Sequence, residues 1–170
     1  MIEILILFEL NRKILTMYGI SKQINNDFSV ITTPSFGTIK PALVRLVNGG
    51  FVRTQKTLSK GGRPSCYYSI TDLGVEELKR LIIGQPVENP VQFLTSARIK
   101  LACADVLNSD EFTSLINNLK MKAKNILLDT ENMITSKELS FYPKMVYDNL
   151  NCEYKNFILL LEGLKNAGSR

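Results

Sequence analysis

The sequence predicts a mainly α-helical protein with one small β-hairpin, divided into two parts. Apolar residues recur at helical spacing over most of the chain. β-branched and aromatic residues cluster in two neighbouring runs, 51–58 and 66–71, on either side of a glycine-rich stretch. Gly84, Pro86 and Pro90 then interrupt the chain, and beyond them the strand pattern disappears while the helical spacing continues.

The first part begins with two predicted helices. Residues 2–10 are almost entirely apolar, and Glu3 and Glu9 predict one hydrated face on this helix. Residues 17–28 form the second helix, which ends in a run of Asn and Asp that is unfavourable inside helices.

A third helix is predicted between its N-cap, Ser35, and the terminating pair Gly49–Gly50. Its buried face holds Ile39, Leu43 and Leu46. Pro41 also lies in this helix, although proline costs roughly 3 kcal/mol in a helix interior. On a helical wheel the opposite face is small and almost uncharged, with hydroxyl and basic groups along its edges: Gly37, Pro41, Val44 and Asn48, edged by Thr38, Lys40 and Arg45.

The hairpin has a glycine-rich tip between Lys60 and Arg63, and a fourth helix follows it. Thr71 caps this helix, over residues 72–83, although Gly74 inside it weakens the helical pattern. The predicted division is a first domain over 1–83, a linker over 84–90 and a helical second domain over 91–170. Three helices are expected in the second domain: 91–107, 110–134 with Ser109 as its cap, and 143–165.

Composition excludes several classes of function. There is no histidine, which removes histidine-based triads and general bases, and no paired carboxylates stand at metal-ligand spacing. Cys66, Cys103 and Cys152 are far apart, which argues against disulfides and zinc. We therefore expect no enzyme activity, cofactor or metal. The chain lacks a run of about 20 apolar residues and a signal peptide, so a cytoplasmic protein without a membrane partner is expected.

Positive charge is concentrated in the first part. Residues 1–83 carry eleven basic and six acidic side chains, which accounts for the whole net charge of +5. No acidic residue lies between Asp27 and Asp72. A segment of one sign and this length favours a polyanionic partner, although a hydrated basic face without a partner has the same composition.

Three helices, a hairpin and a capping helix follow one another in the order of a winged helix–turn–helix. In that arrangement the third helix enters the major groove of DNA and the hairpin tip contacts its backbone. A small, smooth helix face can lie deep in the groove, although the same face could pack on another protein element. The predicted DNA-binding residues are Ser35, Thr38, Lys40, Pro41, Arg45, Lys56, Lys60 and Arg63.

Residues 2–83 resemble the N-terminal domain of PadR-family transcriptional regulators. The resemblance rests on GTIKPALVRLVNGGFV, on GGRPSCYYSITDLGVEEL and on YGISKQI at 18–24. Two departures stand out: Lys40 occupies the tyrosine position before the helix proline, and Ser65 and Cys66 replace the second basic pair of the wing. The resemblance implies a sequence-specific regulator, most often a repressor, that binds a palindromic operator as a homodimer.

The resemblance also implies that the C-terminal helices dimerise. The helix over 143–165 is apolar around much of its circumference, although an intramolecular core would produce the same pattern. The predicted dimerisation residues lie at helical spacing: Val146, Leu150, Tyr154, Phe157, Leu161 and Leu164.

Two other functions remain open at this point. One is a winged-helix module that binds an acidic protein, and the other is a sensor whose main event is binding of a small-molecule effector. Cys66 beside the wing is a conceivable redox switch, but an ordinary strand cysteine fits the sequence better.

Overall fold

The computed structural model describes residues 1–58 and 64–168. The chain separates into two compact units. The first comprises Met1–Gly84 and Val91–Val106, and the second comprises Gln85–Pro90 and Leu107–Arg170. The structure thus groups 91–106 with the N-terminal residues, whereas the predicted division assigned them to the C-terminal domain.

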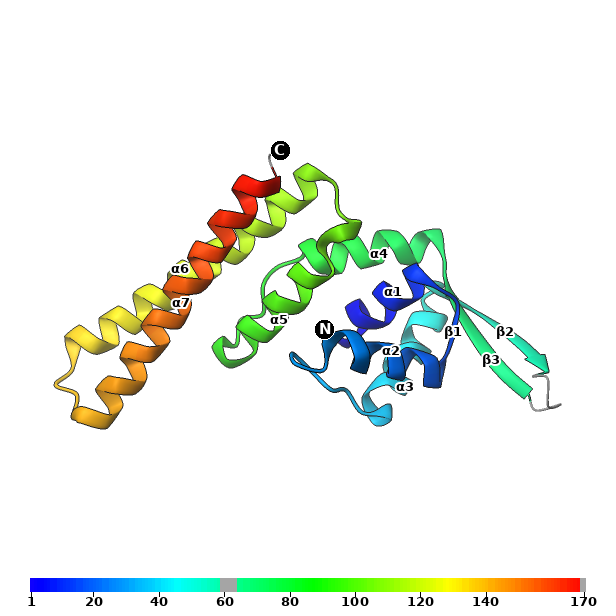
Figure 1. Ribbon diagram of the computed structural model, residues 1–170, viewed down its shortest axis with the longest axis horizontal. Helices are drawn as coiled ribbons and strands as arrows, with labels where there is room; N and C mark the ends of the chain where they lie inside the picture. The colour runs from blue at the N-terminus through cyan, green and yellow to red at the C-terminus, as the bar shows by residue number, and fades with distance from the viewer. Residues whose placement is uncertain (59–63, 169–170) are drawn as a thin grey trace. The chain divides into compact units, whose positions relative to one another are not determined.

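The first unit contains most of the secondary-structure elements (Figure 1). In chain order they are α1 (Ile2–Arg12), β1 (Leu15–Thr16), α2 (Met17–Phe28), α3 (Phe36–Asn48), β2 (Val52–Leu58), β3 (Pro64–Ile70), α4 (Asp72–Ile83), α5 (Pro90–Ala102) and the 3-10 turn η1 (Ala104–Val106). The predicted helices and both hairpin strands are present within a few residues of their expected bounds.

Helix α1 is the centre of this unit, because it contacts α2, α3, α4 and β3. Leu5, Ile6 and Leu7 are almost completely buried, so the apolar run predicts its position correctly. The expectation of a hydrated face is wrong for Glu9, whose side chain is fully buried, while Glu3 is half-buried. Residues 4–10 of α1 are all buried, so neighbouring elements cover this stretch around its circumference, which a helical pattern alone does not reveal.

The hairpin belongs to a three-stranded antiparallel sheet with the order β1-β3-β2. Strand β2 pairs with β3 from Val52 opposite Ile70 to Leu58 opposite Pro64. Strand β1 adds only two residues, Leu15 and Thr16, beside β3. Sequence reasoning missed β1 because two residues are too few to show alternation. The added strand fixes the start of α2 against the middle of β3.

The junction of the hairpin and α4 is tightly packed. The Thr71 hydroxyl accepts a hydrogen bond from the Gly74 amide at 3.0 Å, which confirms the predicted cap. The same hydroxyl donates to the Gly50 carbonyl at 2.8 Å. A Cβ atom on Gly74 would collide with the Phe51 carbonyl and lie 2.7 Å from Ile70 Cγ1. The glycine that weakened the helical pattern is therefore required by close packing.

The second unit is an antiparallel pair of long helices, α6 (Ser109–Ser136) and α7 (Phe141–Gly168) (Figure 1). Asn108 is the N-cap of α6, so the prediction of Ser109 was one residue too late. The Asn108 side chain accepts from the Glu111 amide, and the Glu111 carboxylate accepts from the Asn108 amide. This reciprocal capping box fixes the start of α6.

In the part of the chain that the structure describes, none of the helices combines the length and apolar character needed to cross a bilayer.

Candidate nucleic-acid interface

The faces of α3 are divided as the helical wheel predicts. Ile39, Leu43 and Leu46 are at most 3% exposed and form part of the core, together with Ala42. All residues assigned to the outer face and its edges are exposed: Gly37, Thr38, Lys40, Pro41, Val44, Arg45 and Asn48. The packing of one face thus presents the other to a partner.

Pro41 lies on the exposed side of α3 in its second turn. Because proline has no N–H, the Gly37 carbonyl lacks its helical donor from this position. Gly37 is exposed as well, so its carbonyl oxygen can accept from a solvent molecule or from a ligand in front of the helix. The hydrogen bond that Pro41 removes is therefore lost at the surface, where a donor outside the helix can replace it.

Arg45 is already engaged within the unit. Its Nε donates to Glu3 Oε1 at 2.9 Å, and its Nη2 lies 2.8 Å from the same oxygen. The Arg45 side chain remains 61% exposed, so this ion pair orients the guanidinium without burying it. Sequence reasoning placed Arg45 at the interface but missed the partner, which lies 42 residues away in the chain.

The other described cations of this surface are not compensated. Lys40 on α3 and Arg53 and Lys56 on β2 are exposed, and within the described residues none of them forms an ion pair. Lys60 and Arg63, both predicted to bind DNA, lie outside the described residues. Lys40 borders the outer face of α3, and Lys56 lies on the same face of β2 as Thr54, whereas Arg53 lies on the opposite face of the strand. A polyanion is the partner that such uncompensated cations favour.

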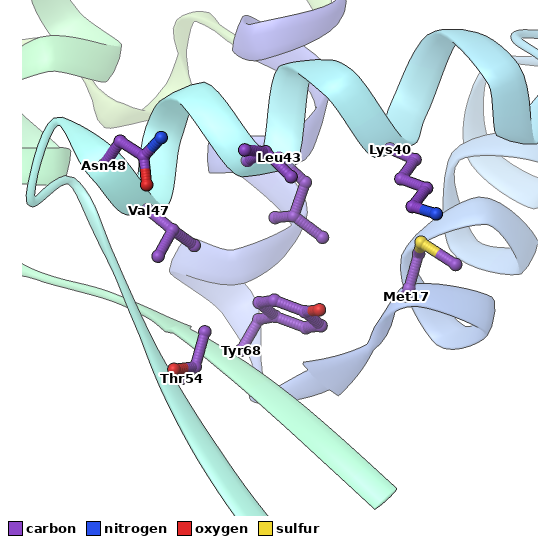
Figure 2. A pocket seen from close by; sticks show the side chains of 8 residues that line it. Met17, Lys40, Leu43, Val47, Asn48, Thr54 and Tyr68 are labelled. Atoms are coloured by element: carbon purple, nitrogen blue, oxygen red, sulfur yellow. The ribbon is translucent and has the colours of Figure 1, made fainter.

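A groove of about 340 Å³ lies between α3 and the sheet. Figure 2 shows Lys40 and Met17 at one end, Val47 and Asn48 at the other, and Thr54 and Tyr68 across from α3. The groove is mainly apolar, with Lys40 supplying its cationic group. Its walls come from the helix and hairpin that the winged helix–turn–helix prediction placed next to DNA.

Two exposed aromatic residues stack at the N-terminal ends of α2 and α3. The rings of Tyr18 and Phe36 have centroids 6.4 Å apart and are inclined by 17°. Tyr18 is 69% exposed and Phe36 46% exposed, so the pair leaves much of its apolar surface in water. Sequence reasoning did not select either residue, because each looks like an isolated aromatic until the fold brings both together.

The start of α3 also carries two exposed hydroxyl groups. Ser35 is its N-cap residue, but the Ser35 side chain makes no capping hydrogen bond to the helix. Instead Ser35 Oγ lies 3.3 Å from Thr38 Oγ1. Both predicted hydroxyl residues are therefore side by side at the N-terminal end of α3, where helix amides favour anionic groups.

The three thiols lie in different environments. Burial, with the charges of Glu9 and Asp105, raises the pKa of Cys103 to about 12, so this thiol stays protonated. Cys66 is half-buried on β3, and Cys152 is exposed on α7. Burial, and secondarily Cys66, raises the pKa of Tyr68, which keeps its hydroxyl neutral.

The predicted dimerisation residues have different environments. Tyr154, Phe157 and Leu161 are at most 6% exposed within the single chain, so their side chains belong to the core of the protomer. Val146 is 59% exposed, whereas Leu150 and Leu164 are half-buried. The intramolecular alternative thus accounts for the centre of this residue set, whereas Val146 is left exposed by the protomer.

Phe36→Ala is expected to weaken DNA binding, by about tenfold, without a loss of stability. The substitution removes an exposed aromatic that can pack on sugars or thymine methyl groups, a contact whose loss costs on the order of 1–2 kcal/mol. Gel-shift titration and thermal melting measure the two effects. Val30→Ala, at another exposed apolar residue, is the control and should leave affinity unchanged.

Comparison with known proteins supports this interpretation of the first unit. Residues 6–80 match the family model described as "Transcriptional regulator PadR-like family". No curated protein matches the sequence.

The chain is also similar to several solved structures. Bacillus subtilis PadR in complex with operator DNA has 22% identity and a TM-score of 0.48, with 98% of each chain covered. B. subtilis PadR in complex with p-coumaric acid has 22% identity and a TM-score of 0.42, with 99% of this chain and 94% of that chain covered. The regulator TA0346 from Thermoplasma acidophilum has 26% identity and a TM-score of 0.41, with 45% of this chain and 72% of that chain covered.

The family match spans α1 to α4, the elements that carry the outer face of α3, the hairpin and the tight junction at Gly74. The family assignment and the geometry therefore agree on the same segment. Over residues 6–80, the chain is similar to the PadR-like family of transcriptional regulators.

Proposed function

We propose that the protein is a transcriptional repressor that binds a palindromic operator as a homodimer. The observation that carries this proposal is the exposed outer face of α3, which is small, free of acidic residues, and accompanied by Lys40 on the helix and Lys56 on β2. Such a face can approach base edges closely, while Lys40, Arg53 and Lys56 neutralise phosphates.

Within this proposal the residues have different roles. Lys56 and Arg53 supply phosphate contacts, which give affinity but little choice of sequence. Thr38 and Lys40 lie on α3 beside the outer face and contact base edges. Arg45, held by Glu3, presents its guanidinium to the backbone in a fixed orientation. Two protomers read two half-sites, so the operator mirrors the two-fold symmetry of the dimer.

Selection of genomic DNA fragments by the purified protein tests the proposal. The expected result is enrichment of an inverted repeat whose half-site centres lie about 10 bp apart, or a multiple of that spacing. Recovery of fragments without a common symmetric motif would contradict it. A reporter placed downstream of the selected site should then be expressed less when the protein is present.

Lys56→Ala and Lys40→Ala should separate the two kinds of contact. Lys56→Ala is expected to weaken binding to all duplexes alike and to reduce the salt slope of log K by about 0.9, the value for one phosphate contact. Lys40→Ala should change affinity unequally among operator variants. Titrations of a selected operator and of its single-base variants at several salt concentrations measure both effects.

A further inference from the structure

The groove between α3 and the sheet runs along the axis of the helix. Its α3 wall consists of residues at positions i, i+3, i+4, i+7 and i+8, which form one stripe on a helix surface: Lys40, Leu43, Val44, Val47 and Asn48. At a rise of about 1.5 Å per residue, this stripe is roughly 12 Å long. Thr54 and Tyr68, which are paired in the sheet register, form the opposite wall. The groove therefore suits an extended ligand better than a compact one.

The floor of the groove is apolar, and its rim is mostly polar. The less exposed lining residues form the floor: Met17, Leu43, Val47 and Tyr68. The exposed lining residues form the rim: Lys40, Val44, Asn48 and Thr54. The volume of about 340 Å³ lies within the range of roughly 300–1,000 Å³ that is usual for small-molecule sites, which also combine apolar walls with a few polar groups. Phosphates do not stabilise an apolar floor, so the floor favours a ligand with an apolar body.

Lys40 supplies the charge at one end of the groove. It is the only charged side chain among the described residues that line the groove, and it forms no ion pair within the described part of the chain. Figure 2 shows the Tyr68 hydroxyl directed toward the end at which Lys40 and Met17 lie. An ammonium group and a hydroxyl donor at the same end of an apolar groove are complementary to a carboxylate.

We propose that the groove binds an unbranched aliphatic carboxylate, with the carboxylate at Lys40 and Tyr68 and the chain extended along α3 toward Asn48. The chain covers the apolar floor at Leu43 and Val47 and displaces water from it. The carboxylate accepts hydrogen bonds from the Lys40 ammonium and the Tyr68 hydroxyl.

A ligand in this position competes directly with operator DNA, a consequence that rests on the proposed function. Lys40 borders the outer face of α3, and Val44 belongs to that face, so the ligand occupies a cation and a surface that DNA would contact. When two ligands exclude each other, the apparent Kd of the first rises in proportion to 1 + [L]/Kd of the second, without an upper limit. A ligand that acts from a separate site leaves a ternary complex, and the apparent Kd then reaches a plateau.

Methyl NMR of the DNA-free protein, titrated with sodium octanoate, tests the site itself. Octanoate is expected to shift the methyl resonances of Met17, Leu43 and Val47 along one saturation curve and to leave Val106, which lines a different cavity of the first unit, unchanged. Octan-1-ol has the chain without the charge, acetate has the charge without the chain, and benzoate is compact. Each should bind at least tenfold more weakly than octanoate. Shifts confined to Val106, or equal affinities for octanoate and octan-1-ol, would overturn the assignment.

Titration of a selected operator at several fixed octanoate concentrations tests the competition. The apparent Kd of the operator should rise linearly and double when octanoate equals its own Kd, as measured by NMR. Acetate at the same concentrations holds the ionic strength equal and should leave the operator affinity at its salt-matched value. A plateau, or an equal effect of acetate, would overturn direct competition.

Two substitutions in the groove test its residues. Val47→Phe fills the floor and should raise the octanoate Kd at least tenfold. Tyr68→Phe removes one donor to the carboxylate and should raise it by about threefold to tenfold. Tyr67→Phe, on the opposite face of β3, is the matched control and should leave it unchanged. Circular dichroism checks folding, and Tyr68→Phe carries the test if Val47→Phe does not fold. Unchanged octanoate binding in Tyr68→Phe would contradict the proposed carboxylate position.

The outcomes separate this inference from the proposed function. A protein that binds its selected operator, but shows no octanoate shifts at Met17, Leu43 and Val47, would overturn the groove site and leave the proposed function standing. A protein that binds octanoate in the groove, but does not bind duplex DNA at low salt, would overturn the proposed function and leave the site standing. Groove shifts together with a linear rise in the apparent operator Kd would establish both the site and the competition.

Discussion

Gly74→Ala is expected to destabilise the first unit by roughly 3 kcal/mol or more, which is in the range of severe overpacking. The added methyl group would collide with the Phe51 carbonyl, a backbone atom that cannot rotate away. The same carbonyl accepts a hydrogen bond from the Thr71 amide at 3.0 Å, so moving it also disturbs the cap of α4. Urea unfolding followed by circular dichroism measures the change.

Gly74 lies where α4 meets the hairpin. The glycine holds the N-terminal end of α4 against the residue that precedes β2, and so fixes the base of the hairpin. Gly37→Ala is the matched control, because a Cβ there meets only Ser35 Oγ, at 3.5 Å. This control should stabilise α3 by up to about 1 kcal/mol. Equal stability of the two variants would contradict the packing argument.

Glu9→Gln is expected to raise the free energy of unfolding at pH 8 by about 3 kcal/mol, from a pKa displacement of about 2.5 at roughly 1.4 kcal/mol for each pH unit. Burial, with the negative charge of Asp27, raises the pKa of Glu9 from 4.5 to about 7. The side chain is fully buried, and neither carboxylate oxygen forms a hydrogen bond within the described residues. Arg12 offers little compensation, because its Nη1 lies 3.9 Å from Glu9 Oε2 but 2.7 Å from Asp27 Oδ2.

The direction of the pH dependence follows from proton binding. Between about pH 4.5 and 7 the folded protein holds the Glu9 proton while the unfolded chain releases it. The contribution of Glu9 to the free energy of unfolding of the wild type is therefore complete below pH 4.5, and it is lost as the pH rises through 7. Glutamine is neutral at every pH, so Glu9→Gln should remove this part of the pH dependence. Glu76→Gln, at an exposed carboxylate, is the control. A wild-type stability that rises between about pH 5 and 8 relative to Glu9→Gln would contradict the assignment.

The helices, the hairpin and the two faces of α3 could be predicted because they depend on local pattern. Apolar spacing identified Ile39, Leu43 and Leu46, and the glycine pair identified the end of α3. Gly50 has a φ of 75°, and the Phe51 amide donates to the Leu46 carbonyl at 3.0 Å. Each of these features is decided by residues within one or two turns of each other.

The features that sequence reasoning missed depend on contacts between distant segments. The sequence pattern predicts a hydrated Glu9, but the elements packed around α1 bury it. Arg45 forms an ion pair with Glu3 of α1, which is distant in the sequence. Tyr18 and Phe36 become one surface only when α2 meets α3. On α7 the apolar helical spacing was detected, but a sequence does not show which of the apolar residues pack within the protomer. Burial in the structure decides that point.

The central claim is that the outer face of α3 contacts duplex DNA. Val44, at 51% exposed, lies on this face, and Leu128, at 56% exposed on α6, is a matched position in the second unit. The decisive measurement is the affinity of wild type, Val44→Glu and Leu128→Glu for a selected operator as a function of salt. We expect log K of the wild type to fall linearly with log salt, Val44→Glu to bind at least about tenfold more weakly, and Leu128→Glu to match the wild type. Equal affinities of Val44→Glu and Leu128→Glu, or no binding by the wild type at low salt, would contradict the claim.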